Sequence, residues 1–294
     1  MIADEDGTIG RMPLPVIRAM TPADVDAAAE TVLRHDWGDR RDHFTFVASY
    51  PRCRAFVATA EGEIVGTGIA TISGAAAWLG TIWVDPRYRG AGLGMALTQT
   101  TVDAAEGEGC RTLLLVATDA GRRLYEKIGF EVQTTYRILE APGLAGQPEP
   151  SVGPDPRIRA FRTDDLEAMA ALDQVATGED RRGIIAAFAT PETAHCLERA
   201  DGTLGGFLIR APWGGGATIA PDIDDAAAIL RWRRLAAGPD KHVRAGLLAE
   251  NAAGLERLAR EGWTEAWHAP RMLRGDPLDW DPSAIWGQFN HAMG

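Results

Sequence analysis

Residues 84–97 read Val-Asp-Pro-Arg-Tyr-Arg-Gly-Ala-Gly-Leu-Gly-Met-Ala-Leu, and this stretch decides the expected fold. It follows an apolar, strand-like segment at residues 76–84 and opens an amphipathic helix with Leu93, Leu97 and Thr101 along one side. A glycine-rich turn between a strand and a helix exposes backbone N–H groups at the positive end of the helix dipole. Such a turn binds phosphate oxygens without needing many cationic side chains.

The spacing of the glycines separates this turn from two other phosphate-binding loops. Gly90 and Gly92 can take positive φ so that the N–H groups converge, and Gly94 leaves room for a bulky ligand at the first helical turn. The order Arg-Gly-Ala-Gly-Leu-Gly departs from the dinucleotide fingerprint, and the Gly-Lys-Ser/Thr of nucleotide hydrolases is absent. On this segment alone, a tight turn without a ligand stays open as the alternative.

A second segment has the same strand-to-helix character. Residues 112–118 form an apolar run, which is followed by Asp119 as the expected N-cap of a short helix and by Gly129 as its stop. Leu124 is expected to face the core. Tyr125 lies about 100° further round the helix, where the phenol can pack while its hydroxyl reaches a cleft.

Together, the two segments resemble the signature of the GNAT N-acetyltransferase superfamily over residues 16–141. The first motif, V-x-P-x-x-R/Q-G-x-G-x-G/A, is matched by Val84, Pro86, Arg89, Gly90, Gly92 and Gly94. The second motif, x-x-L-Y-x-x-x-G-F, is matched by Leu124, Tyr125, Gly129 and Phe130. The resemblance implies an α+β fold, with a mixed central sheet flanked by helices.

The composition is that of a globular protein with an acidic balance. The 294 residues are 46% hydrophobic and carry a formal net charge of −11, which argues against nucleic acid as a partner and is compatible with a cationic acceptor. We expect no membrane span and no signal peptide, since no apolar run is long enough and the first residues are acidic. Cys53, Cys110 and Cys196 are dispersed, which predicts reduced thiols in a cytoplasmic protein without a metal site.

The chain also repeats itself weakly. Residues 17–20 (Ile-Arg-Ala-Met) match residues 158–161 (Ile-Arg-Ala-Phe), and a Pro- and Gly-rich stretch separates the two copies. We therefore predict two tandem GNAT-like lobes. These are an N-terminal acyl-CoA-binding domain at residues 1–141, a linker at 142–156, and a degenerate C-terminal domain with its tail at 157–294.

The second copy lacks the features that bind and use a cofactor. Residues 219–227 contain three carboxylates and no glycine where the first copy has its glycine-rich turn, and Leu258 stands where the first copy has Tyr125. Only the N-terminal lobe is therefore expected to bind the cofactor. Two short stretches, residues 178–181 and 284–287, are similar to segments of tandem GNAT proteins, and a helix cap and an ordinary tail explain them equally well.

The resemblance implies acetyl-CoA as the donor, with the turn holding its pyrophosphate and the pantetheine arm running beside the end of the preceding strand. The residues that it assigns to the cofactor are Trp83, Val84, Arg89, Gly90, Ala91, Gly92, Leu93, Gly94 and Thr118. The family commonly has an Asn near Thr118, and its absence leaves that pantetheine contact open. Tyr125 is the candidate acid for the leaving thiolate, and its alternative role is aromatic packing.

The acceptor side is marked by an acidic segment at residues 35–43, where the family builds its acceptor wall. The candidate acceptor residues are Asp36, Trp37, Asp39, Asp42 and His43. A solvated, helix-capping loop is the alternative, with Asp39 as the N-cap. The general base stays open among this segment, Asp85, His291 and a chain of waters.

These observations predict an acetyl-CoA-dependent N-acetyltransferase that acts on the primary amine of a small molecule, such as an aminoglycoside or another amino-sugar antibiotic. Two alternatives stay open, a protein or peptide N-acetyltransferase and a non-catalytic acyl-CoA sensor. The sequence does not separate a monomer from a homodimer.

Overall fold

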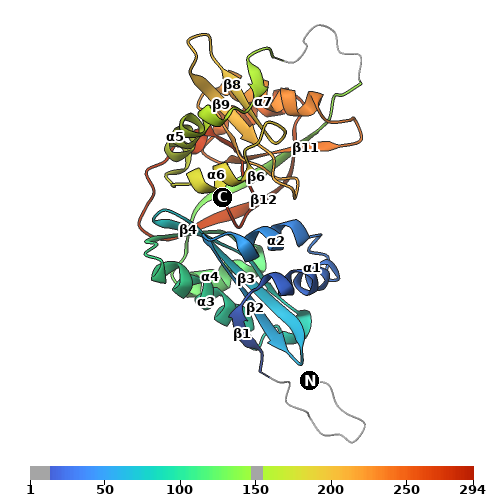
Figure 1. Ribbon diagram of the computed structural model, residues 1–294, viewed down its shortest axis with the longest axis vertical. Coiled ribbons are helices and arrows are strands. Elements are labelled where there is room, and N and C mark those ends of the chain that lie inside the picture. Colours follow the sequence, from blue (N-terminus) through green and yellow to red (C-terminus); the bar gives the residue numbers. More distant parts are fainter. Residues whose placement is uncertain (1–13, 147–154) are drawn as a thin grey trace, which may run out of the picture. The chain divides into compact units, whose positions relative to one another are not determined.

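The computed structural model describes residues 14–146 and 155–294 and divides them into two compact units (Figure 1). Unit 1 holds Leu79–Glu108 and the described residues up to Thr71. Unit 2 holds Ile72–Trp78 and the described residues from Gly109 to Gly294. The acidic N-terminus and residues 147–154 of the predicted linker lie outside the described residues, and the domain boundaries stay predictions.

Unit 1 is a sheet with helices on both faces. Its strands neighbour one another in the order β1 (Val16–Ala19), β2 (Cys53–Ala60), β3 (Glu63–Ser73) and β4 (Ala76–Val84). Its helices are α1 (Val25–Leu33), α2 (Arg41–Ser49) and α3 (Leu93–Gly107). Because side chains alternate along a strand, Val57 packs with α1 and α2, while its neighbour Ala58 packs with Leu93 and Leu97 of α3.

Unit 2 contains the remaining strands in two sheets. In the first sheet, residues 76–78 of β4 pair in parallel with β5 (Thr112–Val116), and β12 (Thr264–Gly275), β6 (Glu131–Pro142) and β11 (His242–Leu248) follow in that order as antiparallel neighbours. The second sheet has the order β13 (Ile285–Gly287), β10 (Thr218–Ile219), β9 (Leu204–Ile209), β8 (Ala194–Glu198) and β7 (Ile158–Ala160).

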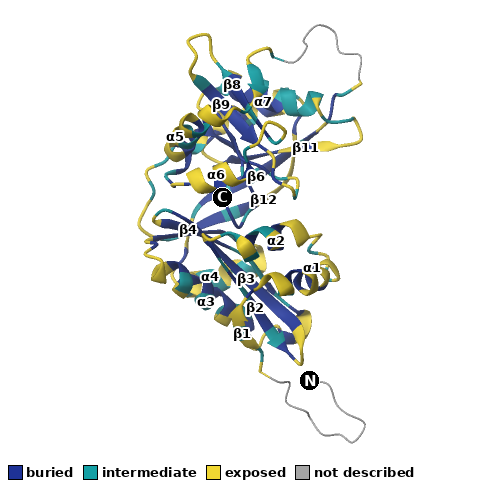
Figure 2. Ribbon diagram, viewed as in Figure 1, coloured by how far each residue is buried: buried dark blue, intermediate teal, exposed yellow. Residues whose placement is uncertain are grey.

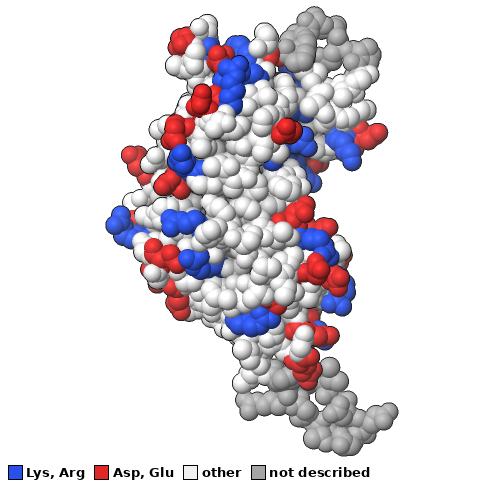
Figure 3. Space-filling view, viewed as in Figure 1, with Lys and Arg blue, Asp and Glu red and all other residues white. Residues whose placement is uncertain are grey.

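The helices of unit 2 are α4 (Asp119–Lys127), α5 (Leu166–Thr177), α6 (Arg182–Phe188), α7 (Ile223–Leu235) and α8 (Ala252–Arg260). Figure 2 shows that buried residues follow the strands, while exposed residues gather on outward helix faces and loops. On the face seen in Figure 3, acidic and basic side chains are interspersed. The predicted mixed sheets flanked by helices are thus confirmed.

Candidate active site

The turn after β4 is shaped by a buried carboxylate. Asp85 is 1% exposed, its Oδ1 accepts the backbone N–H of Arg87 at 2.8 Å, and its carboxylate pairs with the Arg87 guanidinium. This pairing lowers the pKa of Asp85. A carboxylate engaged in this way shapes the short 3₁₀ turn Pro86–Tyr88 and is a poor candidate for a general base.

The glycine-rich turn has the backbone that the sequence predicts. Gly90 and Gly92 have φ of +77° and +90°, and a Cβ at either would meet nothing within 4 Å. The left-handed backbone, rather than crowding, therefore explains why glycine stands there. Both residues are exposed directly before α3, whose first N–H groups have no partner inside the helix. Arg89 is also exposed, and its Nε donates to the Val84 carbonyl at 3.0 Å.

The strand before this turn changes character along its length. Residues 76–78 of β4 are buried and pair with β5. Further along the strand, Gly80, Thr81 and Ile82 are partly exposed. Thr81 has φ of +50°, a conformation that a β-branched residue rarely adopts. The Thr67 hydroxyl donates to the Thr81 carbonyl at 2.7 Å. This part of β4 is therefore held out of regular strand geometry.

In unit 2, α4 begins one residue earlier than the sequence suggests. The N-cap is Thr118, whose hydroxyl accepts the Gly121 N–H at 3.2 Å, and Asp119 is the first helical residue. The prediction of Asp119 as the N-cap was therefore wrong, because the extended backbone of Thr118 places its own hydroxyl over the first turn. Gly129, with φ of +87°, follows the helix end as predicted.

Tyr125 is fixed against the start of its own helix. A Cβ added to Gly121 would lie 2.9 Å from Cε2 of the Tyr125 ring, and Phe130 packs edge-on with its ring centroid 6.2 Å away. Shielding from water raises the pKa of Tyr125 to about 12. At neutral pH the phenol therefore keeps the proton that a general acid must donate.

The candidate acceptor residues divide into exposed and buried members. Asp36, Asp39 and Asp42 are exposed, and Asp39 accepts the N–H of Arg41, the first residue of α2, at 2.9 Å. Trp37 packs on the apolar cluster under α1 and α2. His43 is 2% exposed, and its Nε2 lies 3.3 Å from the Thr81 hydroxyl. Their role towards an acceptor stays a prediction.

The histidines proposed as bases have aromatic neighbours. The Nδ1 of His35 lies 2.8 Å from the Thr31 carbonyl, and its ring centroid is 5.2 Å from that of Trp83. Within unit 2, the ring of His291 lies 4.9 Å from that of Trp267.

Sequence reasoning missed one buried acid of unit 2. Glu179 is 2% exposed, and its carboxylate oxygens accept the Trp78 indole N–H at 3.0 and 2.9 Å. Burial raises the pKa of Glu179. Beside it, Arg181 forms a buried pair with Asp173 at 2.9 and 2.6 Å. A void of about 10 Å³, room for one water molecule, is lined by Trp78, Glu179 and Arg181 among others. The only sequence signal was the weak similarity of residues 178–181 to tandem GNAT proteins.

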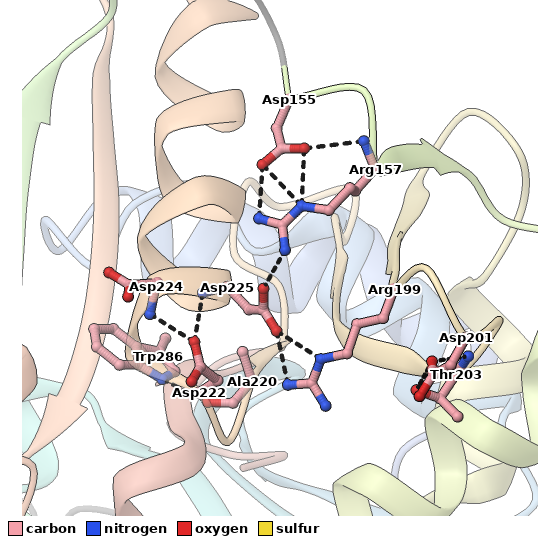
Figure 4. A network of polar contacts seen from close by, with 10 residues as sticks. All are labelled: Asp155, Arg157, Arg199, Asp201, Thr203, Ala220, Asp222, Asp224, Asp225 and Trp286. Carbon is pink, nitrogen blue, oxygen red and sulfur yellow. Dashed lines mark hydrogen bonds and ion pairs between the residues drawn. The ribbon is translucent and has the colours of Figure 1, made fainter.

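The first turn of α7, which the predicted repeat aligns with the glycine-rich turn, is occupied by carboxylates, as Figure 4 shows. Asp222 accepts the N–H groups of Asp224 and Asp225 at 2.9 and 3.0 Å, and so occupies the N-terminus of α7. Asp225 is 4% exposed and pairs with Arg157 and Arg199, at 2.7 Å each. The N-terminus of α7 is therefore already neutralised by the carboxylates of its own first turn.

Among the described residues, no group of three or more His, Cys, Asp or Glu could hold a metal ion, and no helix is long and apolar enough to cross a membrane. Cys53, Cys110 and Cys196 are buried.

Comparison with known proteins points to acetyltransferases. Residues 20–130 match the model of the acetyltransferase (GNAT) family. Over 57 residues the chain is 37% identical to a glucosamine 6-phosphate N-acetyltransferase of Trypanosoma brucei brucei, a match that covers 19% of this chain and 39% of that relative. The chain thus spans well under half of this curated relative.

Two solved structures share the fold over nearly the whole chain. A candidate acetyltransferase from Pyrococcus horikoshii has a TM-score of 0.78 at 20% identity, covering 95% of this chain and 96% of that one. A GCN5-related N-acetyltransferase from Sphaerobacter thermophilus has a TM-score of 0.64 at 19% identity, covering 92% and 100%. The sequence motifs and the matched family model thus identify a GNAT acetyltransferase domain over residues 20–130 of this chain.

Proposed function

We propose that the protein transfers the acetyl group of acetyl-CoA to the primary amine of a small molecule, with an amino sugar as the favoured acceptor class. The observation that carries this proposal is the exposed turn with left-handed Gly90 and Gly92 directly before α3. Backbone N–H groups of this turn, with Arg89, would bind the pyrophosphate. The pantetheine arm would lie beside Trp83 and Val84, and Thr118 would border it.

The reaction needs three contributions from the protein: stabilisation of the oxyanion, a general acid and a general base. The amine nitrogen attacks the thioester carbon, a C–N bond forms, and the C–S bond breaks as the tetrahedral intermediate collapses. Backbone N–H groups near Val84 would stabilise the developing oxyanion. Tyr125 would give its proton to the leaving thiolate, and a base or a water chain would take the proton of the amine. The fixed position of the Tyr125 ring, against Gly121 and Phe130, supports this assignment.

Two observations favour a small acceptor that carries a primary amine. The curated relative acts on glucosamine 6-phosphate, as its name states. The acidic side chains Asp36, Asp39 and Asp42 are exposed around the start of α2, where they could attract an ammonium group. Aminoglycosides fit the same chemistry, because they are amino sugars that carry several primary amines.

The C-terminal copy is proposed to bind no second acyl-CoA. Asp222 and Asp225 hold the N-terminus of α7 and its neighbouring arginines. Leu258, fully buried, offers no hydroxyl. One donor site per chain is therefore expected, and titration with acetyl-CoA would give a stoichiometry of one.

The test is release of free CoA thiol from acetyl-CoA across aminoglycosides, glucosamine and its 6-phosphate, polyamines, amino acids and short peptides. Tyr125→Phe runs in parallel, with Tyr50→Phe as a matched control. The proposal expects turnover on amino sugars and a loss of about 100-fold in kcat for Tyr125→Phe alone. Turnover on peptides only would establish the protein N-acetyltransferase. Saturable acetyl-CoA binding without turnover on any amine would establish a sensor.

A further inference from the structure

Thr81 lies at the centre of an arrangement that the acetyl transfer described above leaves unexplained. Its φ of +50° falls in the left-handed region, where the Cβ of an L-residue crowds its own backbone. Only three described non-glycine residues have positive φ, and the other two, Asp36 and Glu61, lie in loops or turns. Thr81 alone among them is inside a strand.

A strained residue persists where its surroundings over-determine its conformation. Two contacts within unit 1 do so here. The Thr67 hydroxyl, on β3, donates to the Thr81 carbonyl at 2.7 Å. His43, on α2, shares a hydrogen bond of 3.3 Å between its Nε2 and the Thr81 hydroxyl. The carbonyl and the side chain of Thr81 are thus each held by a different element.

The His43 side chain is suited to this fixed role. It is 2% exposed, and burial together with the charge of nearby Arg40 lowers its pKa to about 3. A neutral imidazole has one N–H donor and one acceptor, and keeps both across the physiological pH range. The contact with Thr81 is therefore present at every pH at which the enzyme would work.

The position of Thr81 links this contact to the reaction. Gly80, Thr81, Ile82 and Val84 are partly exposed, whereas residues 76–79 and Trp83 are buried, so a ligand can reach the part of β4 that contains Thr81. Rotating one residue of a strand out of the extended region redirects the peptide groups on both of its sides. The conformation of Thr81 therefore decides which backbone groups β4 presents to a bound acyl group.

We propose that His43 is a positioning residue for acetyl transfer, which acts by holding Thr81 in its left-handed conformation through the Thr81 hydroxyl. The inference rests on the proposed function, since it assumes that β4 carries the acyl group. It gives His43 a role in the reaction that needs no contact with the acceptor and no proton transfer.

Kinetics test the proposal through a pair of variants. His43→Ala should lower kcat by about 10- to 100-fold, the scale of a misplaced reacting group, with little change in the KM for the acceptor and no shift in the pH profile. Thr81→Val removes the same hydrogen bond from the other end and should cause the same loss. Because both variants break the same hydrogen bond, between His43 and Thr81, the double variant should be no slower than either single variant. His195→Ala, outside this arrangement, is the matched control.

Glycine at position 81 is the decisive variant. Glycine takes positive φ without strain, so Thr81→Gly should keep most of the wild-type kcat, and His43→Ala combined with Thr81→Gly should recover it as well. A merely structural role for His43 predicts no such rescue. If the combined variant is as slow as His43→Ala, or if His43→Ala keeps wild-type kcat, the proposal is wrong.

A crystal structure of His43→Ala, or of Thr81→Val if that variant is better behaved, gives a readout without activity. The proposal expects φ of residue 81 to return to the extended region, and a φ still near +50° would refute it. The wild-type enzyme, measured in the same assays, distinguishes a failure of the proposed acetyl transfer from a failure of the role proposed for His43. A wild type that turns over no amine contradicts the proposed function, while the φ of residue 81 still decides the role of His43.

Discussion

At the scale of single residues, the contact between Tyr125 and Gly121 explains a glycine that no turn requires. Gly121 lies inside α4, where alanine would be the better helix former, yet a Cβ there would lie 2.9 Å from the Tyr125 ring. The positive φ predicted for Gly90 and Gly92 was confirmed, because this backbone conformation follows from local sequence. The Tyr125–Gly121 approach and the His43–Thr81 contact could not be predicted, since they depend on side-chain packing.

Gly121→Ala should therefore lower the activity without lowering the stability. Alanine improves the helix by up to about 1 kcal/mol, so the free energy of unfolding should hold or rise, while the displaced Tyr125 ring lowers kcat about tenfold. Thermal unfolding and CoA release measure the two effects. Gly107→Ala, at the end of α3 with nothing within 4 Å of its added Cβ, is the control. Equal kcat in both variants would show that the position of Tyr125 is unimportant.

At the scale of elements, the sequence placed β4 at residues 76–84 and the start of α3 at Leu93, as the structure has them. Apolar runs and helical periodicity are local signals, so they fix the elements well. The cap of α4 was missed because Thr118 and Asp119 are both good N-cap residues, and only the backbone decides between them.

Thr118→Ala should cost about 1 kcal/mol in the free energy of unfolding, because the Gly121 N–H loses the hydroxyl that it donates to. Asp119→Ala should cost less, since this carboxylate lies within the first turn and acts only through the helix dipole. Urea denaturation of the two variants gives the comparison. If Asp119→Ala lowered the free energy of unfolding more than Thr118→Ala, Asp119 would be the N-cap after all.

The left-handed glycines of the turn before α3 lead to a prediction for the binding of acetyl-CoA. Gly92→Ala forces an alanine towards φ of +90°, at a cost of about 1–2 kcal/mol. If the turn shifts to relieve this strain, its N–H groups no longer converge, and the dissociation constant for acetyl-CoA should rise at least tenfold. Calorimetric titration measures it, with Gly109→Ala, another left-handed glycine with open space, as the control for strain alone.

At the scale of the whole molecule, the buried Glu179 makes stability depend on pH. Its pKa is raised in the folded state, so above the ordinary pKa of a glutamate the folded protein binds more protons than the unfolded chain. This contribution is fully present at low pH and is lost as the pH rises through the folded-state pKa. Sequence analysis could not foresee it, because Trp78 and Glu179 are 101 residues apart.

Glu179→Gln keeps an acceptor for the Trp78 indole and removes the ionisation. The free energy of unfolding of this variant should fall less than that of wild type as the pH rises from 5 to 9, and the two curves should diverge most at high pH. Denaturant titrations across that range measure the difference. Glu131→Gln, at an exposed position, should follow wild type throughout. Parallel curves for Glu179→Gln and wild type would contradict the linkage.

The strand β12 has a further consequence, for the order in which the chain can fold as it is synthesised. Residues 264–275 pair with β5 on one side and with β6 on the other, although β5 and β6 leave the ribosome more than a hundred residues earlier. Until β12 emerges, each of these strands has at least one edge with unpaired N–H and C=O groups, which readily joins other chains. A nascent chain stalled before β12 should therefore need chaperone protection, and release of the completed chain should end that need.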